Sequence, residues 1–397
     1  MGNLFYQDVF DNIEDNAALV RTLVSFATEF GLEGNIWQHW LTYNLMTNEN
    51  PFSLTCERKH IREEATLMKL ALPDFAEFRE MMESCPTDYL DDYYSPFDES
   101  TVTGPGKRIM TLSRKLAEAE SNKDFRRIVT DEYEKYGAGI YGLYRAFRVS
   151  AGADGSAEIV PIAETVDVTF DDLIGYESQK ETLRANTEAF VNGEQANNVL
   201  LYGDSGTGKS TSIHALMHDY FDRGLRLVEI GKQARALLPQ VLSEVKKRNY
   251  HFIIFLDDLS FEENESDYKE LKAMLEGALE SREDRVLIYA TSNRRHLIRE
   301  TWGDRSDMEY NEDIHRSDTM EEKLSLASRF GVTIYYSKPD PKEYMNIVRS
   351  LAERRGLQTT GTDLEDEARK WELRHGGMSG RTASQFITWL QGQEIQR

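Results

Sequence analysis

The residues best suited to chemistry lie in one glycine-rich stretch, NVLLYGDSGTGKSTSIHAL, at positions 198–216. Gly203, Gly208, Lys209 and Ser210 match the pattern G-x-x-x-x-G-K-[ST], in which consecutive backbone N–H groups turn toward the phosphates of a nucleotide. The glycines permit a backbone that a Cβ would block. The lysine contacts the phosphates as a point charge, and the hydroxyl is a ligand for Mg²⁺. The pattern therefore predicts a Mg-ATP site.

The prediction covers the whole loop and not its signature residues alone. The expected nucleotide-binding residues of the loop are Gly203, Asp204, Ser205, Gly206, Thr207, Gly208, Lys209, Ser210 and Thr211. A glycine-rich turn that matches by chance is the alternative. The surroundings argue against it, because the apolar run 199–202 predicts a strand before the loop and the periodic residues after Lys209 predict a helix.

Two acids and an amide follow apolar runs farther along the chain. Asp257 and Asp258 end the run HFIIFL, which is typical of a strand buried on both faces. We expect Asp257 to hold Mg²⁺ with Ser210, and Asp258 to orient the attacking water. Asn293 ends the next apolar run, where it would contact the same water or the γ-phosphate. The alternatives are a solvated strand end for the two acids and an ordinary turn residue for the asparagine.

The elements that would position these residues alternate between strands and helices. Apolar runs predict strands at 199–202, 225–230, 251–256, 286–291 and 330–336, with helical patterns between most of them. Such alternation indicates a parallel sheet with helices on both faces. The expected fold class is therefore α/β, with a P-loop in its nucleotide-binding part.

Four regions follow from the pattern. Residues 1–150 are predicted to form a mostly helical N-terminal domain, and 151–167 a linker, of which 151–156 could equally be a hairpin tip. Residues 168–337 are predicted to form the α/β domain, and 338–397 a lid of three helices. The polar stretch 299–320 lacks periodicity, which is typical of a functional or disordered loop.

Bulk composition limits the class of protein. The chain has 397 residues, which predicts two or three domains, and its net charge of −22 argues against coating nucleic acid by bulk charge. Local basic patches would still permit such a contact. Cys56 and Cys85 lack metal-type spacing and are expected to be packed thiols in a reducing compartment. Without a leader pattern or a long apolar run, we expect a soluble, cytoplasmic protein with no membrane partner.

Taken together, the motifs FDDLIG, GDSGTGKS, FIIFLDD, ATSN, SRFG and SGR resemble AAA+ ATPases in kind and order. More closely, residues 168–392 resemble an uncharacterised bacterial AAA+ family that carries a domain-of-unknown-function label. The resemblance implies that Ile174 and Gly175 border the adenine, that Asn293 is sensor 1 and that Arg381 is sensor 2. It also implies that Arg329 is an arginine finger for the γ-phosphate of a neighbouring subunit. AAA+ ATPases more commonly have a glutamate where this chain has Asp258. This difference bears on the rate of hydrolysis more than on nucleotide binding.

Physical chemistry supports arginine at such positions, because guanidinium groups are always charged and suit developing charge on phosphoryl oxygens. Arg381 falls in the first turn of a predicted helix, where the dipole alone would favour an acid. For Arg329 a surface charge at a helix end is the alternative. If Arg329 acts across subunits, the head-to-tail contact closes a ring or continues as a helix, so we expect a homo-oligomer.

The leading functional hypothesis is an ATPase that hydrolyses Mg-ATP in an oligomer to remodel an unknown macromolecular target, with catalytic residues Lys209, Asp257, Asp258, Asn293 and Arg329. The alternative is a slow ATP-dependent switch or loader that acts with DNA-handling proteins. A small-molecule kinase is weaker, because it leaves the sensor and finger positions unexplained. The basic residues 294–296 could contact nucleic acid or a protein, or begin a solvated helix. Arg349, Arg354 and Arg355 are expected on a solvated face of the lid.

Overall fold

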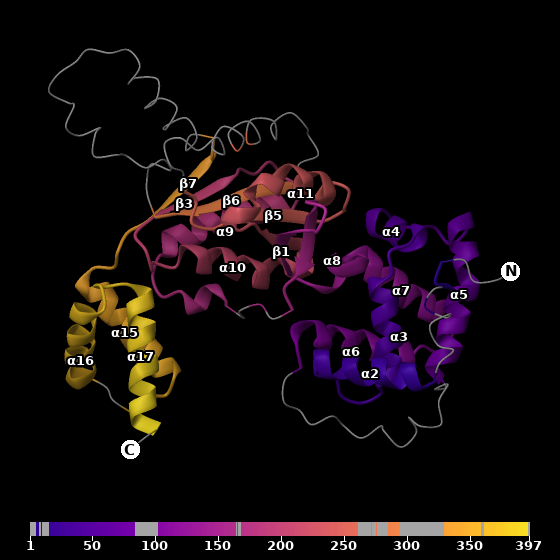
Figure 1. The fold of residues 1–397 in the computed structure, drawn as a ribbon, viewed down its shortest axis with the longest axis horizontal. Helices are drawn as coiled ribbons and strands as arrows, with labels where there is room; N and C mark the ends of the chain where they lie inside the picture. Colours follow the sequence, from indigo (N-terminus) through magenta and orange to yellow (C-terminus); the bar gives the residue numbers. More distant parts are fainter. Residues whose placement is uncertain are drawn as a thin grey trace, which may run out of the picture.

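The fold is that of a computed structural model, shown in Figure 1. It describes residues 5–7, 9, 16–83, 102–163, 165, 168–260, 271, 275, 285–293, 329–358 and 361–395. Several predictions lie outside the described residues: Cys85, the basic residues 294–296 and the polar stretch 299–320. Within 261–284 the structure describes only Leu271 and Leu275, which are helical and buried.

The N-terminal region is helical, as predicted. Its helices are α2 (Asn16–Phe30), α3 (Ile36–Thr47), α4 (Pro51–Arg58), α5 (Thr66–Glu83), α6 (Gly104–Ala117), α7 (Asn122–Tyr136) and α8 (Gly139–Leu143). Capping residues mark where several of these helices begin. The side chain of Asn50, just ahead of α4, accepts from two backbone N–H groups in the first turn of that helix, and Thr103 caps α6. Cys56 is buried in this region, and burial raises the pKa of its thiol to about 12.

The centre of the molecule is a seven-stranded sheet in the order β2-β1-β4-β5-β6-β3-β7. Its strands are β1 (Ala146–Ala151), β2 (Ala157–Pro161), β3 (Val199–Gly203), β4 (Leu225–Glu229), β5 (His251–Leu256), β6 (Val286–Ser292) and β7 (Val332–Tyr336). All neighbours are parallel except β1 and β2. The α/β fold with a mostly parallel sheet is therefore confirmed.

The first two strands occupy part of the segment 151–167, which was expected to be a linker. Residues 151–156 are the turn end of the β1–β2 hairpin, and β1 pairs in parallel with β4 at the sheet edge. Residues 157–161, which were expected to be linker, are a strand, because their backbone pairs antiparallel with β1. The four-region division as a whole stays a prediction.

Helices cover both faces of the sheet. On one face α9 (Glu177–Val191) and α10 (Lys209–Tyr220) pack on alternate strand residues such as Leu201, Ile253 and Phe255. On the other face α11 (Leu238–Val245) and the N-terminal helices share one continuous core with residues such as Phe252 and Ile254. This alternation follows from the two-residue period of a strand. The sandwich of helices around the sheet is as predicted.

Three C-terminal helices form the lid: α15 (Pro341–Arg354), α16 (Gly361–Arg374) and α17 (Gly380–Ile395). Asp340 caps α15 in a reciprocal pair with Glu343, as its sequence predicts. The helices enclose a core of their own that includes Tyr344, Val348 and Phe386. Figure 1 shows the lid on the opposite side of the sheet from the N-terminal helices.

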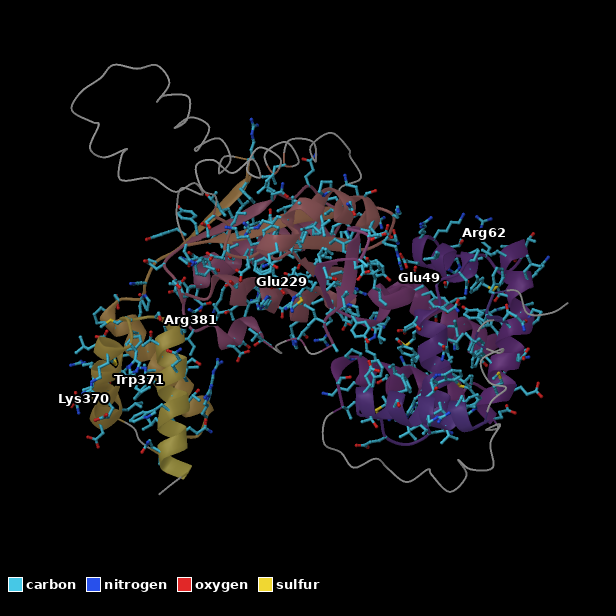
Figure 2. All side chains as sticks on the ribbon, in the orientation of Figure 1. Glu49, Arg62, Glu229, Lys370, Trp371 and Arg381 are labelled. Carbon is cyan, nitrogen blue, oxygen red and sulfur yellow. The ribbon has the colours of Figure 1, made fainter. Side chains whose placement is uncertain are left out.

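A buried ion pair joins the N-terminal helices to the sheet region. Arg248, just ahead of β5, donates from Nη2 to Glu57 Oε2 on α4 at 2.6 Å and from Nε to Oε1 at 3.0 Å. The Glu57 side chain is 2% exposed and that of Arg248 7%. Glu49, at the same border in Figure 2, accepts from Arg248 Nη1 at 2.6 Å.

Among the described residues, no helix has the length and apolarity to cross a membrane.

Candidate functional site

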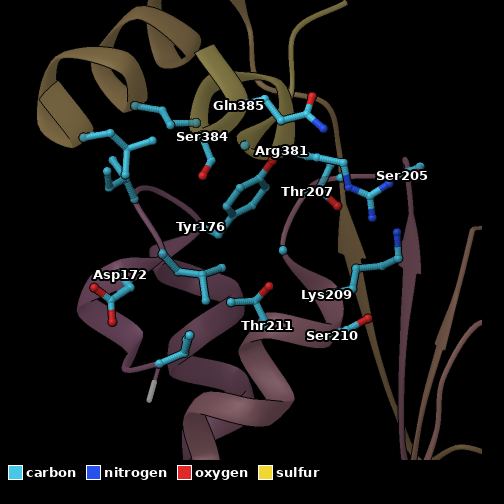
Figure 3. A pocket seen from close by; sticks show the side chains of 18 of the residues that line it. Asp172, Tyr176, Ser205, Thr207, Lys209, Ser210, Thr211, Arg381, Ser384 and Gln385 are labelled. Carbon is cyan, nitrogen blue, oxygen red and sulfur yellow. The ribbon is translucent and has the colours of Figure 1, made fainter. Parts of the chain in front are cut away.

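A cavity of about 1060 Å³ lies between the glycine-rich loop and the lid. Its lining comes from both parts of the chain and comprises Val168, Asp172, Leu173, Ile174, Tyr176, residues 205–211, Asp257, Asp258, Asn293, Ile347, Leu351, Arg354, Arg355, Gly380, Arg381, Ser384 and Gln385. Figure 3 shows Lys209 and Ser210 on one side of this space and Arg381 reaching toward them from the lid. The cavity is large enough for a nucleotide, since small-molecule sites occupy about 300–1,000 Å³.

Two glycines of the loop adopt conformations that disfavour a side chain. β3 ends at Gly203, whose φ is 134°, and a Cβ there would lie 2.1 Å from the carbonyl oxygen of Tyr336 on β7. Gly208 has φ of 95°, and its Cβ would lie 2.6 Å from the side chain of Leu173. Both conformations are strained for other residues. The loop therefore turns between β3 and α10 with its backbone close to the cavity, as the motif predicts.

Lys209, the first residue of α10, is held under the loop. Its side chain is 6% exposed, and Nζ donates to Gly203 O at 3.0 Å, Asp204 O at 2.6 Å and Asn293 Oδ1 at 3.0 Å. Burial lowers the pKa of this amine, although the carboxylates around it act in the opposite direction. A buried ammonium whose bonds go to uncharged oxygens gains from a phosphate anion.

Ser210 and Asp257 meet at the end of β5. Ser210 Oγ donates to Asp257 Oδ1 at 2.7 Å, and Thr291 Oγ1 on β6 donates to the same oxygen at 2.5 Å. The Thr291 hydroxyl also accepts from the backbone N–H of Asp258 at 2.9 Å. A carboxylate and a hydroxyl are the hard oxygen ligands that Mg²⁺ prefers. The two residues proposed for the metal are thus adjacent.

Asp258 and Asn293 are joined side chain to side chain. Asn293 Nδ2 donates to Asp258 Oδ1 at 2.9 Å, while Oδ1 of the same amide accepts from Lys209. Because the lysine only donates and the carboxylate only accepts, this amide orientation is the one that satisfies both neighbours. Asp258 has φ of 47°, and Arg235 Nη2 donates to its carbonyl oxygen at 3.3 Å. Lysine, amide and acid therefore form a connected row along the cavity wall.

The lid contacts the loop side of the cavity at two places. The backbone N–H of Arg381 donates to Gly206 O at 3.2 Å. Arg354 donates to Asp172 Oδ1 at 3.2 Å. Arg354 and Arg355 are exposed, as expected for a solvated face of the lid, and both also line the cavity. Arg349 pairs with Glu365 at 2.7 Å on the lid surface.

The apolar part of the lining lies on the lid side. Ile174 is there, next to Leu173 and opposite Ile347 and Leu351 of α15, which suits an aromatic base. Other predicted site residues are absent from the described lining: Gly175, Gly203, Asp204 and Arg329. The Asp204 carboxylate instead accepts from the backbone N–H of Lys338 at 3.0 Å. Arg329 is exposed in the turn ahead of β7.

The residues present fit ATP and Mg²⁺. The loop geometry that excludes a Cβ at Gly203 and strains one at Gly208, the buried amine of Lys209 and the Ser210–Asp257 pair each match what a Mg-nucleotide requires. The predicted residues Ser205, Gly206, Thr207 and Thr211 join Lys209 and Ser210 in the lining.

Two residues at the site were not predicted. Thr291 lies near the end of β6, which Asn293 follows, and a polar residue at the end of this apolar strand was a signal that could have found it. Arg235 donates to the carbonyl oxygen of Asp257 at 3.2 Å. It comes from a 3₁₀ segment, Lys232–Leu237, and no pattern in the sequence points to this contact.

Comparison with known proteins identifies the family of the chain and finds similar proteins among curated sequences and solved structures. Residues 143–394 match the model of the family described as "Protein of unknown function (DUF815)". The replication factor C large subunit of Methanococcus vannielii is 28% identical over 117 residues, which are 28% of this chain and 24% of that protein. The chain thus spans about a quarter of this curated relative. The structure of the Thermotoga maritima RuvB Holliday junction branch migration motor is 15% identical with a TM-score of 0.35, over 55% of this chain and 71% of that chain.

Proposed function

We propose that this chain, which belongs to the DUF815 family and has an AAA+-type α/β fold, hydrolyses Mg-ATP in an oligomer to remodel a macromolecular target in the cytoplasm. The observation that carries the proposal is the meeting of three groups at one sheet edge. These are the buried Lys209, the Ser210–Asp257 pair and the Asp258–Asn293 pair, which all line one cavity. Such a set has no evident use in an uncharged ligand site.

Binding rests on the loop and the lid together. The backbone of 205–210 and the Lys209 amine take the phosphates, while Ser210 and Asp257 take Mg²⁺. The apolar residues near Ile174 hold the base, with Gly175 next to them in the chain. Arg381 extends over the loop from the lid, as Figure 3 shows, where its guanidinium is suited to the terminal phosphate.

Hydrolysis rests on the row of polar groups beside the metal pair. Bound Mg-ATP would supply the terminal phosphoryl group that water attacks, with ADP as the leaving group. Asp258 orients that water and accepts its proton, and Asn293 fixes the carboxylate through the hydrogen bond at 2.9 Å. Arg329 stabilises the charge in a neighbouring subunit, which accords with its exposed position outside the described lining. The lid contacts at Gly206 and Asp172 transmit the nucleotide state to α15 and α17.

Nucleotide binding is tested by calorimetry with Mg-ATP. Lys209→Ala removes a charge-assisted contact and should weaken binding about 10- to 150-fold, the equivalent of about 1.5–3 kcal/mol. Lys69→Gln is the matched control, because Lys69 is an exposed residue of α5 away from the cavity. Asp258→Asn should retain binding and lose turnover by about 10²- to 10⁴-fold. Equal affinity for wild type and Lys209→Ala would exclude the proposed site.

The trans arginine is tested by mixing variants. Arg329→Ala and Lys209→Ala should each be inactive alone, with a loss of about a thousandfold or more for the arginine. In mixed oligomers a Lys209→Ala subunit still supplies its Arg329 to an Arg329→Ala neighbour, so activity should partly return. Arg127→Ala, at an exposed position of α7, is the control. If mixing restores nothing while the variants co-assemble, Arg329 does not act across subunits.

A slower ATP-dependent switch or loader that acts with DNA-handling proteins is the second candidate. Two observations favour it. The side chain of Asp258 is shorter than that of the commoner glutamate and is hydrogen-bonded to Asn293, and a distant relative is named a replication factor C large subunit. Turnover stimulated several-fold by single-stranded DNA would support it over the remodelling ATPase. Capture of a protein by ATP-loaded Asp258→Asn, and not by Lys209→Ala, would identify the remodelling target.

A further inference from the structure

Another cavity, of about 630 Å³, lies at the border between the N-terminal helices and the sheet. Its walls are α6, α7, residues 143–145 ahead of β1, and the end of α10 with the 3₁₀ turn Phe221–Arg223. Its volume is within the range of about 300–1,000 Å³ typical of small-molecule sites. Nothing in the proposed ATPase mechanism uses it.

The lining of this border cavity is basic in a chain whose net charge is −22. Among the residues that the structure describes, four permanent cations line it: Lys107, Arg108, Lys115 and Arg145. His218 adds an imidazole, and the carboxylates in this described part of the lining are those of Glu132 and Asp222. The local excess of positive charge favours an anionic ligand.

Arg108 is the best-formed donor in the cavity. Its side chain is 17% exposed, Nη2 donates to Glu132 Oε1 at 2.6 Å, and its guanidinium lies 4.0 Å from the centre of the Tyr136 ring. Nη1 is buried and has no hydrogen-bond partner among the described residues. A buried guanidinium N–H without an acceptor is costly, and an anion in the cavity would satisfy it.

Three guanidinium groups surround the ring of Phe221. Those of Arg108, Arg145 and Arg226 lie 5.0, 5.2 and 4.2 Å from its centre. Arg226 is fully buried and donates hydrogen bonds to the carbonyl oxygens of Tyr136, Tyr141, Phe221 and Leu225. Burial lowers its pKa to about 9, and the charge of Arg108 acts in the same direction. This crowding of positive charge would be relieved by an anion.

Helix α6 contributes its N-terminus to the same cavity. Gly104 and Pro105, its first residues, are in the lining, and the first turn contains no acid. Lys107 and Arg108 instead follow within the first five residues, where the helix dipole disfavours cations unless an anion is bound nearby. Leu112 and Leu143 supply an apolar wall for an organic group.

We propose that the border cavity binds a small molecule carrying a phosphate ester or diphosphate group. Guanidinium forks and a helix N-terminus bind phosphate better than a carboxylate of equal size, because they meet several oxygens at once. The site is separate from the one above, since Lys209 begins α10 and His218 lies in its last turn. A helix of 12 residues spans about 18 Å.

The test is calorimetry of the full-length chain with inorganic pyrophosphate at low salt, in a Lys209→Ala background that weakens the nucleotide site. Pyrophosphate binding should persist in this background. Lys107→Gln and Lys115→Gln change exposed side chains of the border cavity and should each weaken binding about tenfold. Lys69→Gln, an exposed lysine of α5, should leave it unchanged.

Arg108→Gln should weaken binding by at least as much, and thermal unfolding would show whether the variant keeps its fold. The proposal is overturned if Lys209→Ala alone removes all pyrophosphate binding, or if both lysine variants bind as tightly as their parent. Failure of ATP binding at the first cavity would not affect this result, because the probe is measured with that site impaired.

Discussion

The buried pair Glu57–Arg248 allows a sharp prediction about stability. Glu57→Gln keeps the shape of the side chain but replaces one carboxylate oxygen by an NH₂ group. The carboxylate accepts five hydrogen bonds, from Arg248 Nε and Nη2, Asn249 N, Ala138 N and Tyr250 OH, at 2.6–3.3 Å. After the change at least two of these donors face another donor.

The magnitude follows from burial. Glu57 is 2% exposed and Arg248 7%, so water does not replace the lost acceptor. Breaking a buried ion pair by removing one partner costs about 3–5 kcal/mol. Glu49, which is 40% exposed, still accepts from Arg248 and keeps the cost toward the lower end. The total stability of a domain is about 5–15 kcal/mol, so the loss is a large share of it.

Urea unfolding followed by circular dichroism at pH 7 measures this loss. Glu63→Gln is the matched control, because Glu63 also pairs with an arginine, Arg126 at 2.9 Å, but is 62% exposed. The control should lose less than about 1 kcal/mol. If Glu57→Gln loses no more than the control, the argument that burial makes this pair costly to break is wrong.

The difference in stability between wild type and Glu57→Gln should also depend on pH. Burial alone would raise the pKa of Glu57, but the hydrogen bonds and charge of Arg248 outweigh it and lower the pKa below its usual 4.5. A lowered carboxyl pKa stabilises the fold above the unfolded pKa, and this stabilisation is lost as the pH falls through the folded value. The stability gap between wild type and Glu57→Gln should therefore narrow below about pH 4.5.

Three further predictions concern single side chains. Gly203→Ala should destabilise by about 2–5 kcal/mol in thermal unfolding and weaken ATP binding, because its Cβ meets a backbone oxygen of β7, whereas Gly155→Ala, with open space around it, should cost about 1 kcal/mol. Burial lowers the pKa of His251 to about 4. The free energy of unfolding of wild type should therefore fall by about 3 kcal/mol between pH 6.5 and 4, because the unfolded chain gains a proton there and the folded chain does not. Urea unfolding at several pH values should show no such fall for His251→Phe. Thr291→Val removes a donor to Asp257 and should lower ATPase turnover about tenfold with little effect on thermal stability; an unchanged rate would mean that the carboxylate needs no such support.

The sequence predicted the features that depend on local pattern. The loop around Lys209 and the buried strands that end at Asp257 and Asn293 are readable because chain order and apolar runs determine them. The sheet edge was harder: Ala157–Pro161 is short, and only its pairing with β1 identifies it as a strand.

Contacts between distant segments were beyond the sequence. Arg226 and Arg248 are buried, although charged residues are usually at the surface. Arg226 bonds to the distant Tyr136 and Tyr141 as well as to near neighbours, and Arg248 bonds to the distant Glu57, so no spacing rule indicates these contacts. The contact of Arg354 with Asp172 was not predicted for the same reason, since it depends on how the lid sits against the loop.

The core shared by the N-terminal helices and one face of the sheet bears on how the chain can be shortened. The family match begins at residue 143, just ahead of β1, and so cuts across that core. A fragment starting there would leave Phe147, Phe252 and Ile254 facing water, and an apolar patch of that kind promotes aggregation. A shortened chain should therefore keep the N-terminal helices. The lid, which has a core of its own, is the part to remove first.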